Sequence, residues 1–194
     1  MRLGMIWFME LMKRGTKFLT KEIFIDTDCI SAFLWVENES LLEKLYPGRI
    51  VMPRPVYEEM NRPNLAWMKL RIDSMVENGS LRIVELNDGT EEFELYYKMT
   101  ENPDAGHAVI GNGEASAIAL AKTQKGIVAS NNFRDILGYI KEYSLDYTTT
   151  ADILVDAYNR NVIDEDQGNK IWNDMLKKRR RIGAKSFSEY LSKC

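Results

Sequence analysis

Short apolar runs alternate along the chain with longer stretches in which apolar residues recur every three or four positions. The short runs predict buried strands, and the longer spacing predicts helices that bury one face. The predicted strands cover Glu22–Asp26, Ile50–Met52, Leu81–Leu86, Gly126–Ala129 and Leu145–Tyr147. Because strands alternate with helices, the pattern predicts an α/β sandwich around a mostly parallel sheet.

The predicted helices fill the segments between these strands and the end of the chain. Turn signals such as Pro47-Gly48 and Asn78-Gly79 separate them. Thr149 or Thr150 is the expected cap of a helix after the last strand, with two or three helices in that region. The other predicted helices carry Ile30–Leu34, Leu41–Leu45, Val56–Met60, Leu65–Val76, Glu91–Met99, Glu114–Thr123 and Asn132–Tyr143.

The composition is that of a globular domain of ordinary size. The chain has 194 residues, of which 45% are hydrophobic and 28% are charged. This is enough for one domain with a sizeable core. The formal net charge of -3 neither requires nor excludes a nucleic-acid partner, because a nuclease can combine an acidic site with a local basic patch.

Cysteine and histidine usage counts against several enzyme classes. The two cysteines, Cys29 and Cys194, lie far apart, which indicates a reducing cytoplasm rather than a disulfide framework. The sequence has no cluster of Cys and His of the kind that binds zinc. Nothing marks a nucleophile beside His107, the only histidine.

The first 21 residues differ in pattern from the rest. The apolar run Leu3–Met12 is interrupted by Glu10 and has no small-residue cleavage site before Lys13-Arg14. It is shorter than the roughly 20 apolar residues of a membrane span. We expect residues 1–21 to be a leader or docking helix, or the result of a start codon placed too far upstream. Residues 22–194 are expected to form a single domain with C-terminal helices and no membrane association.

Three acids lie at the ends of predicted elements. Asp26 closes the first predicted strand, Glu59 follows the second, and Glu114 opens the Ala-rich helix. Glu59 lies nearer the apolar face of its helix than Glu58 does. Sites in parallel sheets gather at the carboxyl ends of strands, where converging carboxylates make an oxygen-ligand site for Mg²⁺ or Mn²⁺. Each acid also has a structural interpretation, as a helix cap, a surface glutamate or a first-turn acid.

Polar and basic residues elsewhere add further candidates. Ser130-Asn131-Asn132 follows the fourth predicted strand, and Asp135 comes one helical turn later. Asn oxygens can complete a metal shell, although the segment also fits a simple helix start. The run Lys177–Arg181 is typical of a solvated helix face and can equally hold phosphates. The tryptophans and tyrosines are interpreted as core and edge residues rather than base-stacking platforms.

These segments together resemble the PIN-domain ribonucleases, the family that includes the VapC toxins of toxin–antitoxin pairs. The most specific match is Gly113–Ala121, and the order and spacing of the segments strengthen the resemblance, which covers about residues 22–160. The matching segments are Phe24–Thr27, Val51–Glu59, Gly113–Ala121 and Ile127–Asn132, with a further likeness at Arg181–Phe187.

The resemblance implies a PIN-like three-layer sandwich and a Mg²⁺- or Mn²⁺-dependent endoribonuclease that leaves 3′-hydroxyl and 5′-phosphate ends. Asp26, Glu59 and Glu114 would hold the metal, helped by Asn132 or Asp135. Asp28 and Ser130 would orient ligands or substrate. Basic residues near the carboxyl end would grip the RNA backbone, and a homodimer and an antitoxin partner are implied.

One departure from the family pattern leaves alternatives open. The fourth acid of the family falls at Asn131 or Asn132, where this chain has amides. A second metal would then bind more weakly, unless Asp135 substitutes, a single metal suffices or activity is lost. A PIN-like module that binds RNA or protein without cutting is therefore the second hypothesis. The third is an aspartyl phosphotransferase of the haloacid dehalogenase type, with Asp26 as nucleophile.

Overall fold

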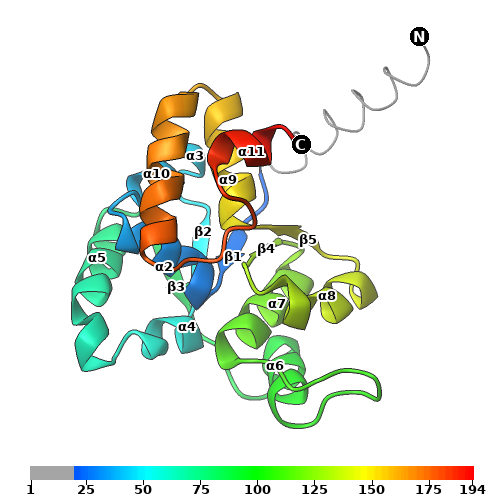
Figure 1. The fold of residues 1–194 in the computed structure, drawn as a ribbon. Coiled ribbons are helices and arrows are strands. Elements are labelled where there is room, and N and C mark those ends of the chain that lie inside the picture. Colours follow the sequence, from blue (N-terminus) through cyan, green and yellow to red (C-terminus); the bar gives the residue numbers. More distant parts are fainter. Residues whose placement is uncertain (1–19) are drawn as a thin grey trace.

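A five-stranded sheet lies at the centre of this computed structural model (Figure 1), which describes residues 20–194. Most of the predicted leader or docking helix, residues 1–19, lies outside the described residues. Every neighbouring pair of strands is parallel, and the order is β3-β2-β1-β4-β5. The strands are β1 (Ile23–Ile25), β2 (Ile50–Pro53), β3 (Leu81–Val84), β4 (Ile127–Ala129) and β5 (Asp146–Thr148).

Helices connect all these strands, as the apolar spacing predicts. The predicted break between the first two helices, the turn at Gly48 and the cap at Thr149 are all present. None of the described helices is long and apolar enough to cross a membrane. The helices are α2 (Thr27–Trp35), α3 (Ser40–Leu45), α4 (Arg54–Glu59), α5 (Ala66–Glu77), α6 (Glu91–Glu101), α7 (Asn112–Gln124), α8 (Phe133–Glu142), α9 (Thr150–Asn159), α10 (Glu165–Lys177) and α11 (Phe187–Leu191), with a 3-10 turn η1 (Pro63–Leu65).

The sheet is covered on both faces, which gives three layers. Alternate side chains of β1 enter opposite cores, because successive residues of a strand point to opposite faces. Ile23 and Ile25 pack with α2, α3, α5, α9 and α10, whereas Phe24 packs with α6, α7 and α8 (Figure 1). The predicted α/β sandwich is therefore confirmed, and the sheet is parallel throughout.

Small residues let α7 lie close to the sheet. Ala115, Ala117, Ala119 and Ala121 are completely buried, and α7 packs against β1, β2 and β4. The helix begins at Asn112, two residues before the predicted start. Glu114 is consequently the third residue of α7, in its first turn.

The strand order reverses direction between β1 and β4. From β1 the chain builds outward through β2 and β3, and then returns to place β4 and β5 on the other side. Such a reversal leaves a crevice at the carboxyl ends of the two strands, where open α/β sheets bind ligands. Asp26 follows β1 there, and Ser130 follows β4.

The basic run near the carboxyl end is mostly outside a helix. Helix α10 ends at Lys177, so Lys178–Arg181 lie in the segment that leads to α11. The interpretation of this run as a helix face is therefore wrong for all but its first residue. Figure 1 shows this segment crossing in front of the sheet on its way to α11.

Candidate metal centre

Asp26 has one oxygen engaged and one buried without a partner. It caps α2, and its Oδ1 accepts a hydrogen bond of 2.7 Å from the backbone N–H of Cys29. The interpretation of Asp26 as a helix cap is thus confirmed, and its backbone has the extended conformation of a cap residue. Its side chain is only 1% exposed. Among the described residues, Oδ2 has no hydrogen-bond partner.

Burial changes the protonation of this carboxyl group. Desolvation by burial, helped by the negative charges of Glu114 and Asp28, raises the pKa of Asp26 from 3.8 to about 7. The Cys29 N–H and the nearby Ser130 hydroxyl oppose this rise because they favour the anion, although within residues 20–194 no group meets the geometry of a hydrogen bond to Oδ2. The effects of Glu114 and Ser130 agree with their places in the fold, because Ser130 follows β4, which pairs with β1, and Glu114 lies in the first turn of α7, which packs against β1.

Glu59 lies on α4, beside Thr27 and Gly113. It is the last residue of this helix and is partly buried, whereas Glu58 is exposed. The prediction that Glu59 lies on the inner face is confirmed. The hydroxyl of Thr27 donates a short hydrogen bond to Glu59 Oε2, which joins the start of α2 to the end of α4.

Gly113 allows α7 to approach this pair. A Cβ atom at Gly113 would lie 3.2 Å from Thr27 Oγ1 and 3.3 Å from Glu59 Oε1. Those separations are tighter than ordinary contacts, so the absence of a side chain permits the close packing. The next residue, Glu114, is partly buried and enters the site from the first turn of α7.

The two asparagines after β4 have different roles. The Asn131 side chain donates to Thr150 Oγ1 at 2.8 Å and accepts from the Thr150 N–H at 2.9 Å, so it connects β4 to α9. Asn132 Nδ2 instead donates to Glu114 Oε1 at 3.1 Å and to Asp135 Oδ2 at 2.8 Å. Of the two amides, Asn132 is therefore the one that belongs to the acidic site.

The predicted site residues other than Asp26 form two bonded groups. One contains Thr27 and Glu59 and contacts Gly113, and the other joins Glu114, Asn132 and Asp135. Within residues 20–194, no three acidic, Cys or His side chains already stand in the arrangement of a complete metal cage. Instead, Glu59 accepts a hydrogen bond from Thr27, and Glu114 accepts one from Asn132.

Comparison with known families decides the assignment of the fold. The sequence profile of the PIN domain matches residues 22–194. The chain belongs to the PIN-domain family. Comparison with curated protein sequences finds no match. Among solved structures, the structure of FitAB bound to an IR36 DNA fragment is similar, with a TM-score of 0.47 and 15% sequence identity over 66% of this chain and 94% of that chain.

The donor atoms of this PIN domain suit a divalent cation. Carboxylate and amide oxygens are the ligands that Mg²⁺ and Mn²⁺ prefer. The buried Oδ2 of Asp26, which has no hydrogen-bond partner in the described part of the chain, carries a desolvation penalty that a cation would relieve. Rotation of the Asn132 amide by half a turn would exchange its nitrogen for its oxygen, which is an available ligand. The residues present therefore fit the group that the family implies.

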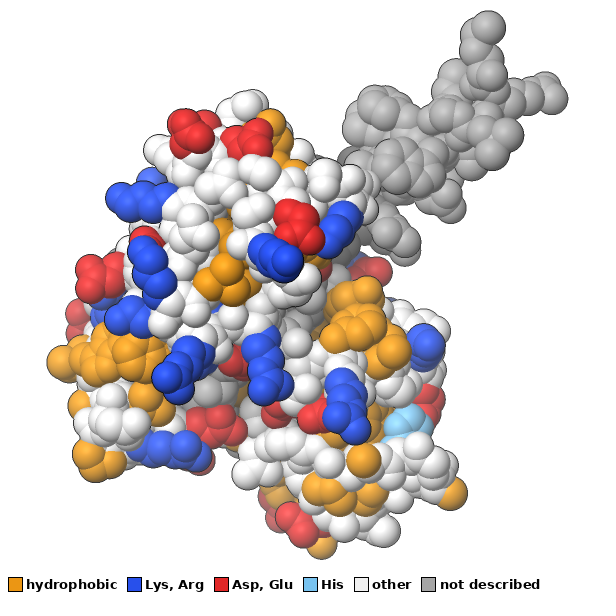
Figure 2. Space-filling model, in the orientation of Figure 1, with side chains coloured by type: hydrophobic (Ala, Val, Ile, Leu, Met, Phe, Trp, Pro, Cys, Tyr) orange, Lys and Arg blue, Asp and Glu red, His pale blue; other side chains and the backbone are white. Residues whose placement is uncertain are grey.

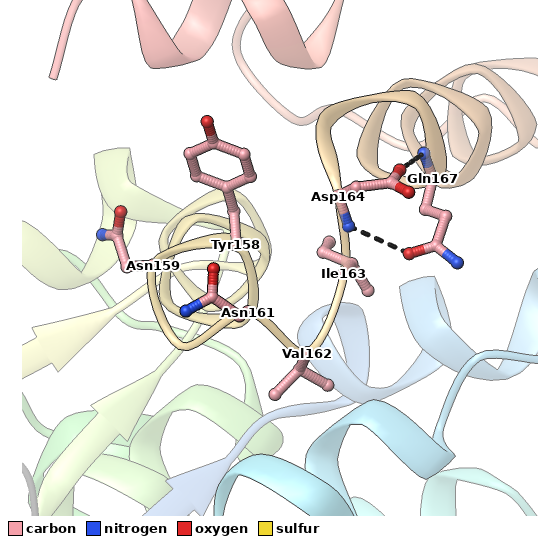
Figure 3. Close-up of a pocket in the computed structure, with 7 residues that line it drawn as sticks. All are labelled: Tyr158, Asn159, Asn161, Val162, Ile163, Asp164 and Gln167. Atoms are coloured by element: carbon pink, nitrogen blue, oxygen red, sulfur yellow. Dashed lines mark hydrogen bonds between the residues drawn. The ribbon is translucent and has the colours of Figure 1, made fainter.

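The pocket in Figure 3 lies away from this PIN-domain site. It is formed where α9 ends and α10 begins, whereas α9 begins beside Asn131. Ten residues of helix separate the two ends, which is about 15 Å. Figure 3 shows Asp164 and Gln167 bonded to each other's backbone, so this reciprocal cap engages two of the polar side chains that line the pocket.

Sequence reasoning missed the supporting residues. Sequence patterns alone give neither Thr27 nor Gly113 a role of its own, although both contact Glu59 or the space beside it. The family-like motif Gly113–Ala121 was a sequence signal that Gly113 matters. No signal identified the partner of Thr27, because α2 and α4 meet only in the folded protein.

Proposed function

We propose that the chain is a Mg²⁺- or Mn²⁺-dependent endoribonuclease. The observation that carries the proposal is the Oδ2 of Asp26, which is buried and has no hydrogen-bond partner within residues 20–194, at the point where the strand order reverses. PIN-domain membership supports nuclease chemistry at this place. When bound there, a divalent ion supplies positive charge for the phosphate under attack and lowers the pKa of nearby water.

The side chains of this PIN domain have separate tasks in the proposal. Asp26 and Glu114 would hold the ion together with the oxygen of Asn132, and Asp135 would replace part of the charge that the amide lacks. Thr27 keeps Glu59 directed toward the crevice through its hydroxyl. Hydrolysis would leave a 3′-hydroxyl and a 5′-phosphate.

The chain offers a matched pair of variants for the test. Glu59→Gln and Glu114→Gln should each reduce Mn²⁺-dependent cleavage of RNA at least a hundredfold, because each removes a negative charge from the site. Glu58→Gln is the control, since Glu58 is exposed and adjacent to Glu59. EDTA-sensitive cleavage that is unchanged in Glu114→Gln would remove Glu114 from the mechanism.

A second candidate is a PIN domain that binds RNA or protein without cutting. The amide of Asn132, which donates its N–H groups to two acids, favours it. Calorimetric titration with Mn²⁺ distinguishes the two functions, because a non-cutting module without a metal would bind none at millimolar concentration. The phosphotransferase hypothesis loses its support, since the chain belongs to the PIN-domain family and Asp26 is buried.

We also propose a homodimer and an antitoxin partner, from the resemblance to VapC toxins. Light scattering on the purified chain tests the dimer. Co-purification of the chain with the product of a neighbouring gene tests the antitoxin.

A further inference from the structure

The basic segment after α10 is turned sharply toward α2. Arg179 N–H bonds to Leu176 O at 2.8 Å, and Arg180 N–H bonds to Met175 O at 3.0 Å. This is the Schellman pattern at the end of a helix, where glycine usually occupies the left-handed position. Arg179 occupies it with φ of 58°, which is unfavourable for a residue with a Cβ. The turn fixes the direction in which Arg180 leaves the helix.

The cations of this turn lie along one face of α2. Arg180 Nη1 is 3.4 Å from Asp28 Oδ1 and 3.4 Å from Ser31 Oγ. The Lys178 ammonium lies 5.5 Å from the centre of the Trp35 ring. Asp28, Ser31 and Trp35 share a helix face because they are three and four residues apart. We call these three residues, with Lys178 and Arg180, the α2 strip.

The α2 strip begins beside the acidic site. Asp28 lies in the first turn of α2, two residues after the Asp26 that caps this helix. Helix α2 has nine residues and is therefore roughly 13 Å long, with Trp35 at its far end. A strand of nucleic acid that occupies the site would meet Arg180 first and Lys178 next.

Arg180 is held more loosely than other paired arginines of the chain. Its 3.4 Å contact with Asp28 compares with 2.6 Å for Arg82 and Glu22, and 2.8 Å for Arg160 and Asp156. Among the described residues, its Nη2 makes no hydrogen bond, while Nε bonds to the Lys178 carbonyl. The side chain is 26% exposed. Two N–H donors are thus available for an oxyanion.

The surroundings of the strip favour a single-stranded nucleic acid. Trp35 and Trp67 are both partly exposed, and their rings meet edge to face at 4.9 Å. Cations beside aromatic rings are the combination that binds single strands. Figure 2 shows Lys and Arg side chains in a row across the middle of this face, with acidic side chains between them and an apolar patch at one end.

We propose that the α2 strip binds the backbone of single-stranded RNA next to the acidic site, with Arg180 contacting a phosphate and Lys178 the following one. The identity of the nucleic acid rests on the proposed nuclease function. From the sequence we expect only that basic residues near the carboxyl end hold the RNA backbone. The α2 strip gives this role to Lys178 and Arg180, along one face of α2.

Binding of RNA without cleavage tests this proposal. The parent is the full chain with Glu114→Gln in EDTA, and the probe is a fluorescent single-stranded RNA of about 12 nucleotides. Arg180→Ala should weaken binding about tenfold at low salt, and should reduce the slope of log affinity against log salt by about 0.7. Lys178 is exposed, and Lys178→Ala removes its contact with the Trp35 ring. This variant should reduce the salt slope by a similar amount.

Controls separate charge at the strip from general effects. Arg82→Ala also breaks an arginine–carboxylate pair, but Arg82 and Glu22 lie toward the amino ends of the strands; this variant should bind RNA like the parent. Arg180→Lys should retain the salt slope. Thermal unfolding should show that each variant is folded.

Two outcomes overturn the strip: a parent that binds no RNA, or Arg180→Ala and Lys178→Ala variants whose affinity and salt slope equal those of the parent. If wild-type chain still cleaves RNA in the second case, the strip fails while the nuclease proposal stands. Reduced slopes without any cleavage by the wild-type chain would support the strip and count against the nuclease.

Discussion

The two oxygens of Asp26 have different surroundings, and this difference governs the chemistry at the residue scale. Oδ1 caps α2, whereas Oδ2 is buried without a partner among the described residues. The capping interpretation from sequence therefore describes one oxygen, and the ligand interpretation concerns the other. Both follow from the position of the residue, between the end of β1 and the start of α2.

Asp26→Asn should stabilise the metal-free protein at pH 8 by about 2–4 kcal/mol. Because the pKa of Asp26 is raised in the folded protein, its favourable contribution to the free energy of unfolding is fully present below pH 3.8. That contribution is lost as the pH rises through about 7. Asparagine stays neutral, so the gain should shrink as the pH falls from 8 to 5. Urea unfolding in EDTA measures both values, and a destabilised variant at pH 8 would contradict the account.

Asn132→Asp should bind Mn²⁺ more tightly, by about tenfold, and should be less stable without metal. The substitution replaces two donated hydrogen bonds, to Glu114 and Asp135, by repulsion among three carboxylates. Calorimetry measures the affinity, and thermal unfolding in EDTA measures the stability. Asn131→Asp is the comparison, since Asn131 is bonded to Thr150. Equal Mn²⁺ affinities for wild type and Asn132→Asp would place the amide outside the metal site.

Local sequence patterns single out the acidic candidates but not the residues that support them. Asp26 and Glu114 stand in local patterns, an acid after an apolar strand and an acid after glycines. Which of Asn131 and Asn132 faces the site depends on Thr150, which follows β5 and is distant in sequence. Such a pairing has no local signature, so both amides remained candidates until the fold was known.

At the scale of elements, α7 positions the site because it can pack closely. Its buried alanines bring it against β1, β2 and β4, and Gly113 brings its first turn against Thr27 and Glu59. The Ala-rich pattern predicted the close packing of the helix. The earlier start of α7, at Asn112, was not predicted, since Asn and Gly favour turns and caps over helix interiors.

Gly113→Ala should reduce RNA cleavage at least tenfold while the protein remains folded. The added methyl group would press on the Thr27–Glu59 pair at 3.2 Å and 3.3 Å, although alanine itself favours the helix by about 1 kcal/mol. A cleavage assay with thermal unfolding on the same samples measures both effects. Asn112→Ala, at the exposed neighbouring position, should leave cleavage unchanged. Full activity of Gly113→Ala would show that the pair tolerates displacement.

At the scale of the whole molecule, the carboxyl-terminal helices complete one of the two cores. Phe187 of α11 is fully buried and packs on Trp172 and Tyr158. A Cβ at Gly168 would lie 2.2 Å from the Phe187 ring, so a glycine is needed there. The number of terminal helices was predicted, but their packing was not, because it depends on contacts between α9, α10 and α11.

Phe187→Ala should lower the free energy of unfolding by about 3–4 kcal/mol. The substitution leaves a cavity beside Trp172 and loosens the segment that carries Arg180, so RNA affinity should fall as well. Urea unfolding and RNA binding measure the two effects. Phe93→Ala, at a partly exposed position on α6, should change stability much less. A Phe187→Ala protein as stable as wild type would mean that α11 is not docked on this core.

The most direct test of the central claim is the position of Mn²⁺ in a crystal of the wild-type chain soaked with the ion. The account predicts an anomalous difference peak within ligand distance of Asp26 Oδ2 and a Glu114 carboxylate oxygen, in the crevice between β1 and β4. Loss of that peak in Glu114→Gln crystals would agree with it. An Mn²⁺ ion bound elsewhere, with this crevice free of anomalous signal at saturating concentration, would contradict it.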